Sequence, residues 1–204
     1  MSVGRAHSAL IRRLFEIGAI RFGEFTLKSG ITSPFYIDLR VVISFPDVLE
    51  QIGVLMAAVV ARCGGDRVGG IPYAGLPLAV AASLAGRMPL IYPRREEKGY
   101  GTRRRIEGQF KAGERVVLID DIITDGASKL EAIQPLEEAG LVVKDLVVLV
   151  DREQGGRELL AARGYTVHPV LTISQCFDEG ERAGLAPAEL IRQSREFLKA
   201  SRFA

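Results

Sequence analysis

The chain has 204 residues, a length that favours one domain over two. Its 27 basic and 25 acidic residues give a formal net charge of +2, which argues against a polybasic nucleic-acid coat and against an acidic tail protein. A composition that is 48% hydrophobic and 25% charged excludes global disorder.

The N-terminal segment predicts an amphipathic helix rather than a secretory signal. Leu10, Ile11 and Leu14 fall on one side of such a helix, and Arg12 and Arg13 fall on the other. The segment lacks the apolar core of a signal peptide, and no stretch of the chain reaches the roughly 18 apolar residues of a membrane span. We therefore expect a cytoplasmic protein that does not associate with a membrane.

The first half of the chain then mixes short strands with helices. Strand-forming residues within 22–37 are interrupted by a polar turn, which predicts two short strands. Helices are predicted from Pro46 to the glycines at 64 and 65 and over residues 75–86. Strands are predicted over residues 67–71 and 89–92, and the polar, glycine-containing segment 94–108 is predicted to be a long loop.

The second half alternates strands and helices regularly. Strands are predicted over residues 115–120, 145–151 and 165–171, and helices over 127–139, over 157–163 and from Pro187 onward. The uninterrupted apolar runs of the first two strands are typical of strands covered on both faces, and therefore of a parallel sheet. This alternation indicates the α/β class.

Two adjacent acids, Asp120 and Asp121, follow a buried strand and precede the segment Thr124–Ser128, which opens a helix. Ligands of parallel sheets bind beyond the carboxyl ends of the strands, and free amides at a helix start attract anions. A sugar phosphate fits this polarity, with its hydroxyl groups or a hydrated metal on the acids and its phosphate on the amides. The alternative is an ordinary strand–turn–helix with an aspartate as N-cap. The sequence contains neither a P-loop nor a dinucleotide-binding glycine pattern.

The stretch DDIITDGAS also resembles the phosphoribosyl pyrophosphate signature of the type I phosphoribosyltransferases. The resemblance implies that Asp120 and Asp121 hold the ribose and act in catalysis, and that the loop over residues 124–128 holds the 5′-phosphate. The residues implied to bind phosphoribosyl pyrophosphate here are Asp120, Asp121, Ile122, Ile123, Thr124, Asp125, Gly126, Ala127 and Ser128.

The segment 94–105 contains six basic and two acidic residues, a local charge of +4. By itself it could be a solvated loop or a nucleic-acid patch, or a lid that neutralises a polyanion. It resembles the catalytic loop of orotate phosphoribosyltransferases, which implies that Arg94, Arg95, Lys98 and Tyr100 contact pyrophosphate, with Lys98 catalytic. Tyr100 followed by glycine is closer to the form found in bifunctional UMP synthases. The chain ends at Ala204, so we expect no decarboxylase domain.

Three further motifs match the same family: TLKSGITSPFYIDLR at residues 26–40, GIPYAGLPLA at residues 70–79, and the pair Asp151-Arg152. They imply that Lys28, Tyr73 and Ala74 contact phosphoribosyl pyrophosphate, and that Tyr36, Ile37, Thr124 and Arg152 contact orotate. Without the resemblance, each motif also has a purely structural interpretation. Lys28 would be a solvated side chain, Tyr36 a core residue, the segment around Tyr73 and Ala74 a connecting turn, and Arg152 a surface side chain.

The resemblance implies an orotate phosphoribosyltransferase of de novo pyrimidine (UMP) biosynthesis. The implied fold is that of the type I phosphoribosyltransferases, a central, mainly parallel sheet flanked by helices. It forms one domain over residues 1–204, with a core over about 41–172 and a hood from about 1–40 and the C-terminal helix. The enzyme would use Mg²⁺ carried by pyrophosphate, touching Asp120 or Asp121 only through water. It would be a homodimer that shares the 94–105 loop across its interface.

Two alternatives stay open at this point. One is a transferase for a purine or uracil, and the other is a non-catalytic regulatory relative that binds nucleic acid, although we expect no nucleic-acid partner. The remaining reactive side chains fit no motif: His168 is expected to be structural, and Cys63 and Cys176 are expected to be inert.

Overall fold

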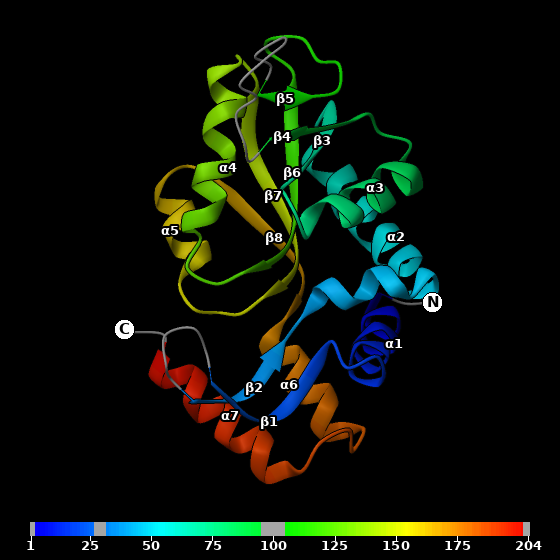
Figure 1. Cartoon of the computed structure of the whole chain (residues 1–204), viewed down its shortest axis with the longest axis vertical. Helices are drawn as coiled ribbons and strands as arrows, with labels where there is room; N and C mark the ends of the chain where they lie inside the picture. The colour runs from blue at the N-terminus through cyan, green and yellow to red at the C-terminus, as the bar shows by residue number, and fades with distance from the viewer. Residues whose placement is uncertain (1–2, 27–31, 95–104, 202–204) are drawn as a thin grey trace.

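A six-stranded sheet forms the centre of the molecule in a computed structural model that describes residues 3–26, 32–94 and 105–201 (Figure 1). The strand order is β5-β4-β3-β6-β7-β8, and all neighbouring strands are parallel except the β4–β5 pair. The strands are β3 (Arg67–Gly70), β4 (Leu90–Pro93), β5 (Ile106–Glu107), β6 (Arg115–Ile123), β7 (Val142–Asp151) and β8 (Thr166–Thr172).

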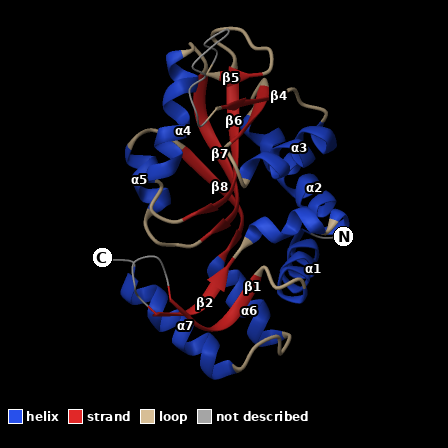
Figure 2. Cartoon of the chain, in the orientation of Figure 1, coloured by secondary structure: helices blue, strands red, loops and turns tan. Residues whose placement is uncertain are grey.

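Helices cover both faces of this sheet (Figure 2). Successive side chains of a strand point to opposite faces. Val117 and Ile119 therefore pack with α2 (Pro46–Cys63) and α3 (Gly75–Gly86), whereas Val116 and Leu118 pack with α4 (Ala127–Glu138) and α5 (Gly156–Ala162). This burial of both faces explains the uninterrupted apolar runs, and the predicted α/β class is confirmed.

The remaining elements gather at one end of the sheet (Figure 1). They are α1 (Val3–Glu16), the antiparallel pair β1 (Ile20–Thr26) and β2 (Thr32–Ile37), the 3₁₀ helix η1 (Leu39–Ser44), α6 (Ile173–Arg182) and α7 (Ala188–Ser201). Phe35 of β2 holds them together, because its ring packs edge-on against two other rings. The ring centroids are 5.2 Å apart for Phe177 and 6.0 Å apart for Phe197. These side chains belong to the same hydrophobic cluster as α2 and its sheet face, so the end layer is continuous with the core.

The structure corrects the predicted elements at four places. Strand β6 continues to Ile123 instead of ending at Asp120, because Ile122 and Ile123 pair with β7. Strand β5 lies inside the predicted loop over 94–108, where it pairs with β4. The sequence analysis did not predict η1 or α6, although Thr172 and Gln175 form a capping box at the start of α6. Across the described ranges, no helix combines the length and the apolarity needed to cross a bilayer.

Candidate active site

The carboxyl ends of β3, β6 and β7 meet at one edge of the sheet, where parallel α/β folds bind their ligands. A cavity of about 430 Å³ opens there. Its walls come from the β3–α3 turn, the end of β4, strand β6 and the first turns of α4. The lining residues include Tyr73, Ala74, Arg94, Arg105, Asp120, Asp121, Ser128 and Lys129.

The two predicted acids lie at this cavity, inside β6 rather than after it. Asp120 is buried, and its Oδ2 lies 2.6 Å from Nζ of Lys129, which is also buried. The backbone amide of Asp121 donates to Oδ1 of Asp120 at 2.8 Å, and the amide of Ile122 donates to Oδ1 of Asp121 at 2.8 Å. Both carboxylates are thus fixed by the strand itself.

The environment of Asp121 disfavours its charge. Burial is the main cause, and the neighbouring Asp120 carboxylate adds to it, so the pKa of Asp121 lies well above its ordinary value. Lys129 acts in the opposite direction but is already engaged with Asp120. Without a ligand, the pair therefore carries one well-compensated charge and one poorly compensated charge. Ribose hydroxyl groups or a hydrated cation would satisfy the second.

The turn between β6 and α4 is the segment that the sequence analysis predicted to hold an anion. Gly126 has a φ of 85°, a left-handed conformation suited to glycine, and the amide of Ala127 donates to Oδ1 of Asp125 at 3.0 Å. Gly156 holds the turn from behind: its amide donates to the carbonyl oxygen of Thr124 at 2.9 Å, and a Cβ there would lie 2.6 Å from that oxygen. Ser128 and Lys129, in the first turn of α4, line the cavity, whereas residues 124–127 are not among its lining residues. Free amides at the start of a helix favour an anion, and binding of an anion here stays a prediction.

The β3–α3 turn supplies the opposite wall. Tyr73 is 59% exposed, and Tyr73 and Ala74 both line the cavity, with a cis peptide between Pro72 and Tyr73. A Cβ on Gly75 would lie 2.6 Å from the carbonyl oxygen of Ile119, so only glycine allows this turn to approach β6 so closely. The turn thereby presents its backbone beside the acid pair.

Arg152 follows β7 at the same edge of the sheet. Its backbone amide donates to the carbonyl oxygen of Ile123 at 3.0 Å, which places it directly behind the β6–α4 turn. The guanidinium carbon, Cζ, lies 5.4 Å from the centroid of the Phe35 ring. Partial burial lowers the pKa of Arg152 below its ordinary value. The Nε atom is buried and has no hydrogen-bond partner among the residues that the structure describes. A half-buried arginine whose Nε is buried without a partner favours an anionic ligand.

Several predicted residues are not among the residues that line the cavity. Arg152 and residues 122–127 belong to this group, as do Tyr36 and Ile37. The ring centroids of Tyr36 and Phe25 are 5.5 Å apart, and the guanidinium of Arg21 lies over the Tyr36 ring. Ile37 packs against the hydrophobic core. The Ile123 side chain is also buried in the core, so only its backbone is available to a ligand. Their roles in binding stay predictions.

The 94–105 segment is described only at its two ends. Arg94 pairs with Glu107 at 2.8 Å, and Arg105 pairs with Glu138 at 3.1 Å. Both arginines line the cavity, so the segment starts and finishes beside the acid pair. The predicted residues Lys28, Arg95, Lys98 and Tyr100 lie outside the described residues.

Lys129 is the main site residue that the sequence analysis missed. The first turn of a helix disfavours a cation, because the amides there carry partial positive charge. A lysine at this position, directly after the small residues of the turn, was therefore a signal that an acid had to lie nearby. Arg105 was also missed, although it belongs to the basic segment.

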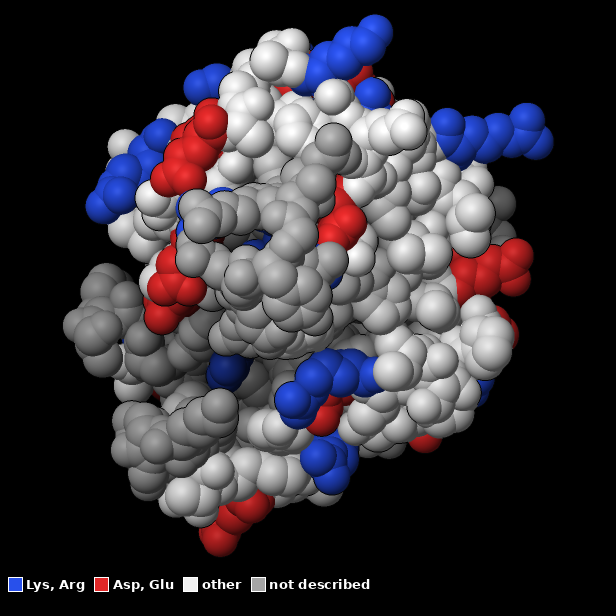
Figure 3. All heavy atoms as spheres, turned by 45° about the horizontal axis from the view of Figure 1, so that its top comes forward, with Lys and Arg blue, Asp and Glu red and all other residues white. Residues whose placement is uncertain are grey.

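A larger hollow, of about 790 Å³, lies around Arg105, Phe110 and Glu138. Its lining contains neither member of the acid pair, which the smaller cavity does contain, so the chemistry assigns the candidate site to the smaller cavity. On the face that Figure 3 shows, the described basic and acidic side chains are interspersed instead of forming one basic patch.

Comparison with known proteins agrees with this geometry. No family model matches the chain. It is 40% identical over 197 residues to the uridine 5′-monophosphate synthase of Bos taurus, covering 96% of this chain but 41% of that protein. It is 40% identical over 178 residues to the orotate phosphoribosyltransferase of Thermococcus gammatolerans, covering 86% of this chain and 94% of that protein.

A solved structure also matches. The UMP synthase of Leishmania donovani superimposes with a TM-score of 0.86 at 39% identity, over 95% of this chain and 42% of that chain. The chain thus spans about two fifths of the bovine and Leishmania proteins, and nearly the whole of the Thermococcus protein. The resemblance and the fold inferred from the motifs are confirmed.

Proposed function

The chain belongs to the orotate phosphoribosyltransferase family, and we propose that it transfers the 5-phosphoribosyl group from phosphoribosyl pyrophosphate to orotate. The products are orotidine 5′-monophosphate and pyrophosphate, in the de novo pathway to UMP. A bond from the anomeric carbon to pyrophosphate breaks, and a bond from that carbon to a ring nitrogen of orotate forms.

The observation that carries the choice of orotate is the half-buried Arg152. Its guanidinium is desolvated and Nε lacks a partner among the described residues, directly behind the turn that cradles phosphate. Orotate carries a carboxylate, and the planar fork of arginine matches a carboxylate with two parallel hydrogen bonds. Uracil and hypoxanthine lack this group and would leave the buried Nε of Arg152 without an anion.

The remaining side chains divide the work on the sugar. Asp120 and Asp121 accept hydrogen bonds from the ribose hydroxyl groups, and their negative charge favours the positive charge that develops at the anomeric carbon. The amides of the β6–α4 turn, with Thr124 and Ser128, hold the 5′-phosphate. Tyr73 and Ala74 offer backbone contacts to pyrophosphate from the opposite wall. The cationic 94–105 segment, including Lys98, compensates the charge that builds on the departing pyrophosphate.

We propose Mg²⁺ as the metal that accompanies pyrophosphate. Oxygen donors suit this ion, and Asp121 is the carboxylate at the cavity that Lys129 does not compensate directly. The ion would neutralise the leaving group, while the protein touches only its water shell through Asp121 or Asp120.

A homodimer is the assembly we propose, with the 94–105 segment reaching the partner's cavity. Exposed apolar side chains on the α2–α3 side support a protein interface. Val54 of α2 is 55% exposed, and Val80 and Leu84 of α3, one helical turn apart, are 44% and 75% exposed. Gly53 of α2 and Ala81 of α3, the chain neighbours of Val54 and Val80, pack closely against each other. The exposed apolar side chains of the two helices therefore lie beside the same α2–α3 contact. Two free cysteines in the described chain are compatible with the cytoplasmic location that we propose.

The decisive experiment is a base panel. Purified protein with Mg²⁺ and phosphoribosyl pyrophosphate should deplete the absorbance of orotate and leave uracil and hypoxanthine unchanged. Asp121→Asn provides the control with strongly reduced turnover. Turnover of another base in place of orotate would overturn the assignment. A gel shift with a salt titration tests the nucleic-acid alternative, for which we expect no salt-sensitive complex.

A further inference from the structure

Three potential metal ligands converge on the α2-covered face of the sheet, towards the amino ends of the strands. Asp145 lies early in β7, and His168 of β8 pairs in register with Val147, so both side chains point to the face that α2 covers. Cys63 is the last residue of α2, which ends above them. The catalytic acids lie farther along the sheet, towards its carboxyl edge, and this group therefore forms a separate cluster.

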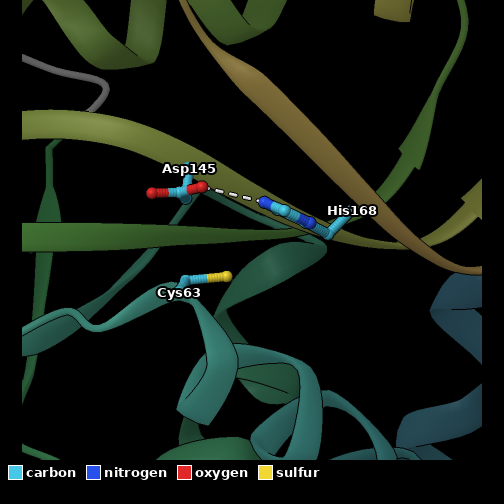
Figure 4. A group of neighbouring side chains, drawn as sticks. All are labelled: Cys63, Asp145 and His168. Atoms are coloured by element: carbon cyan, nitrogen blue, oxygen red, sulfur yellow. Dashed lines mark hydrogen bonds and ion pairs between the residues drawn. The ribbon is translucent and has the colours of Figure 1, made fainter.

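The three ligand atoms are close and accessible. Sγ of Cys63, a carboxylate oxygen of Asp145 and a ring nitrogen of His168 all lie within 4.8 Å of one another, and each residue is half-buried. Nε2 of His168 lies 2.8 Å from Oδ1 of Asp145. Figure 4 shows the side chains facing a shared gap from three separate elements. In a tetrahedral zinc site, neighbouring ligand atoms lie about 3.5 Å apart, so small side-chain rotations suffice.

From this geometry we propose that Cys63, Asp145 and His168 form a site for a divalent transition metal of the zinc class. A thiolate, an imidazole and a carboxylate are the donor set that Zn²⁺ accepts, and Mg²⁺ or Ca²⁺ would prefer oxygen alone. Three protein ligands leave a fourth position for water. The bound ion would tie the end of α2 to β7 and β8.

Arg115 supplies the surrounding shell of this site. Its Nη2 lies 3.4 Å from Oδ2 of Asp145 and 3.3 Å from the carbonyl oxygen of Cys63. Oδ1, the atom that faces His168, therefore remains for the metal, while Arg115 orients the carboxylate from the other side. This arrangement makes Asp145 a monodentate ligand.

Cobalt(II) is the spectroscopic probe of choice, added to tag-free, chelator-dialysed protein. We expect one equivalent of Co²⁺ per chain to give a thiolate-to-cobalt band in the near ultraviolet together with tetrahedral visible bands, and Zn²⁺ to abolish both. Zn²⁺ should also slow the alkylation of Cys63 in the unaltered protein, as read by peptide mass spectrometry. This second measurement needs no variant and is independent of any effect on folding.

Single variants assign the ligands. Cys63→Ala should remove the thiolate band, and Asp145→Asn and His168→Gln should each weaken Co²⁺ binding by about tenfold or more. The matched controls Cys176→Ala and His7→Gln should leave the spectrum unchanged. A missing band at stoichiometric Co²⁺, a band that survives Cys63→Ala, or alkylation of Cys63 unaffected by Zn²⁺ would overturn the proposal. Since Mg²⁺ at the acid pair gives no thiolate band, this outcome is independent of orotate turnover.

Discussion

Asp120 and Asp145 lie on the neighbouring strands β6 and β7 and illustrate two ways of placing an acid in one sheet. Asp120 has an 8% exposed side chain and faces α4, where Lys129 meets it at 2.6 Å. Asp145 has a 16% exposed side chain and faces α2, where it meets His168 at 2.8 Å and Arg115 at 3.4 Å. The first acid has a permanent, buried cation as its partner, and the second has partners that solvent or a ligand can replace.

This difference separates a pre-organised site from an exchangeable one. The Lys129–Asp120 pair fixes one charge next to the cavity and leaves Asp121 as the carboxylate without a direct partner in Lys129. At the other cluster, a histidine, a thiol and an acid sit close together without a buried cation holding them. A metal ion could therefore take the place of the His168–Asp145 hydrogen bond.

The largest effect should come from breaking the buried pair. Lys129→Met leaves the Asp120 carboxylate uncompensated, and we expect the free energy of unfolding to fall by about 3–5 kcal/mol in urea titrations. The double variant Lys129→Met/Asp120→Asn should recover most of that stability without recovering turnover. Equal stability of the single variant and the parent would mean that the pair is not held as described.

Asp121→Asn should separate catalysis from stability. We expect turnover to fall by roughly 10²- to 10³-fold, because the carboxylate that faces the developing positive charge is lost. In the ligand-free protein at pH 8, stability should rise by about 1 kcal/mol, because burial opposes the charge of Asp121.

The pH dependence follows from the raised pKa of Asp121. The folded state holds the Asp121 proton more tightly than the unfolded state. Its contribution to stability is therefore present below the unfolded pKa and is lost as the pH rises through the folded pKa. The stabilising effect of Asp121→Asn should accordingly disappear in acid, and an equal gain at pH 4 and pH 8 would contradict the assigned cause.

Arg152→Gln should act on one substrate only. We expect the KM for orotate to rise by about 100-fold, because the orotate carboxylate loses its partly desolvated cationic partner. The KM for phosphoribosyl pyrophosphate should change by less than about twofold. Arg152→Lys should restore little, because an ammonium group cannot offer the planar pair of donors. Equal changes in both KM values would show a general loss of structure instead.

The smallest effect should come from the Cys63 cluster. We expect Cys63→Ala to leave orotate turnover within about twofold of the parent and to lower stability by no more than about 1 kcal/mol, because the side chain is only partly buried. Initial rates with saturating substrates and urea titrations measure both quantities. A large loss of turnover in a stable variant would mean that the two clusters are coupled through the sheet.

Local patterns in the sequence were enough to predict much of the candidate site. The apolar strand, the two acids and the small residues at 124–128 predicted an anion cradle beside carboxylates, because all of its parts are contiguous in the chain. Arg152 could be named only through the family motif. Its burial against Phe35 depends on β2 packing beside the end of β7, which no local pattern encodes.

The sequence by itself determined the α/β class, the order of the main elements and the acid–glycine turn, because periodicity and turn chemistry are short-range properties. The extension of β6 through its acids, the pairing of Asp120 with Lys129 and the meeting of Cys63, Asp145 and His168 were decided only by the tertiary structure. Each depends on side chains that the sheet register and the helix packing bring together. His168 and Asp145, for example, are 23 positions apart in sequence but 2.8 Å apart in space.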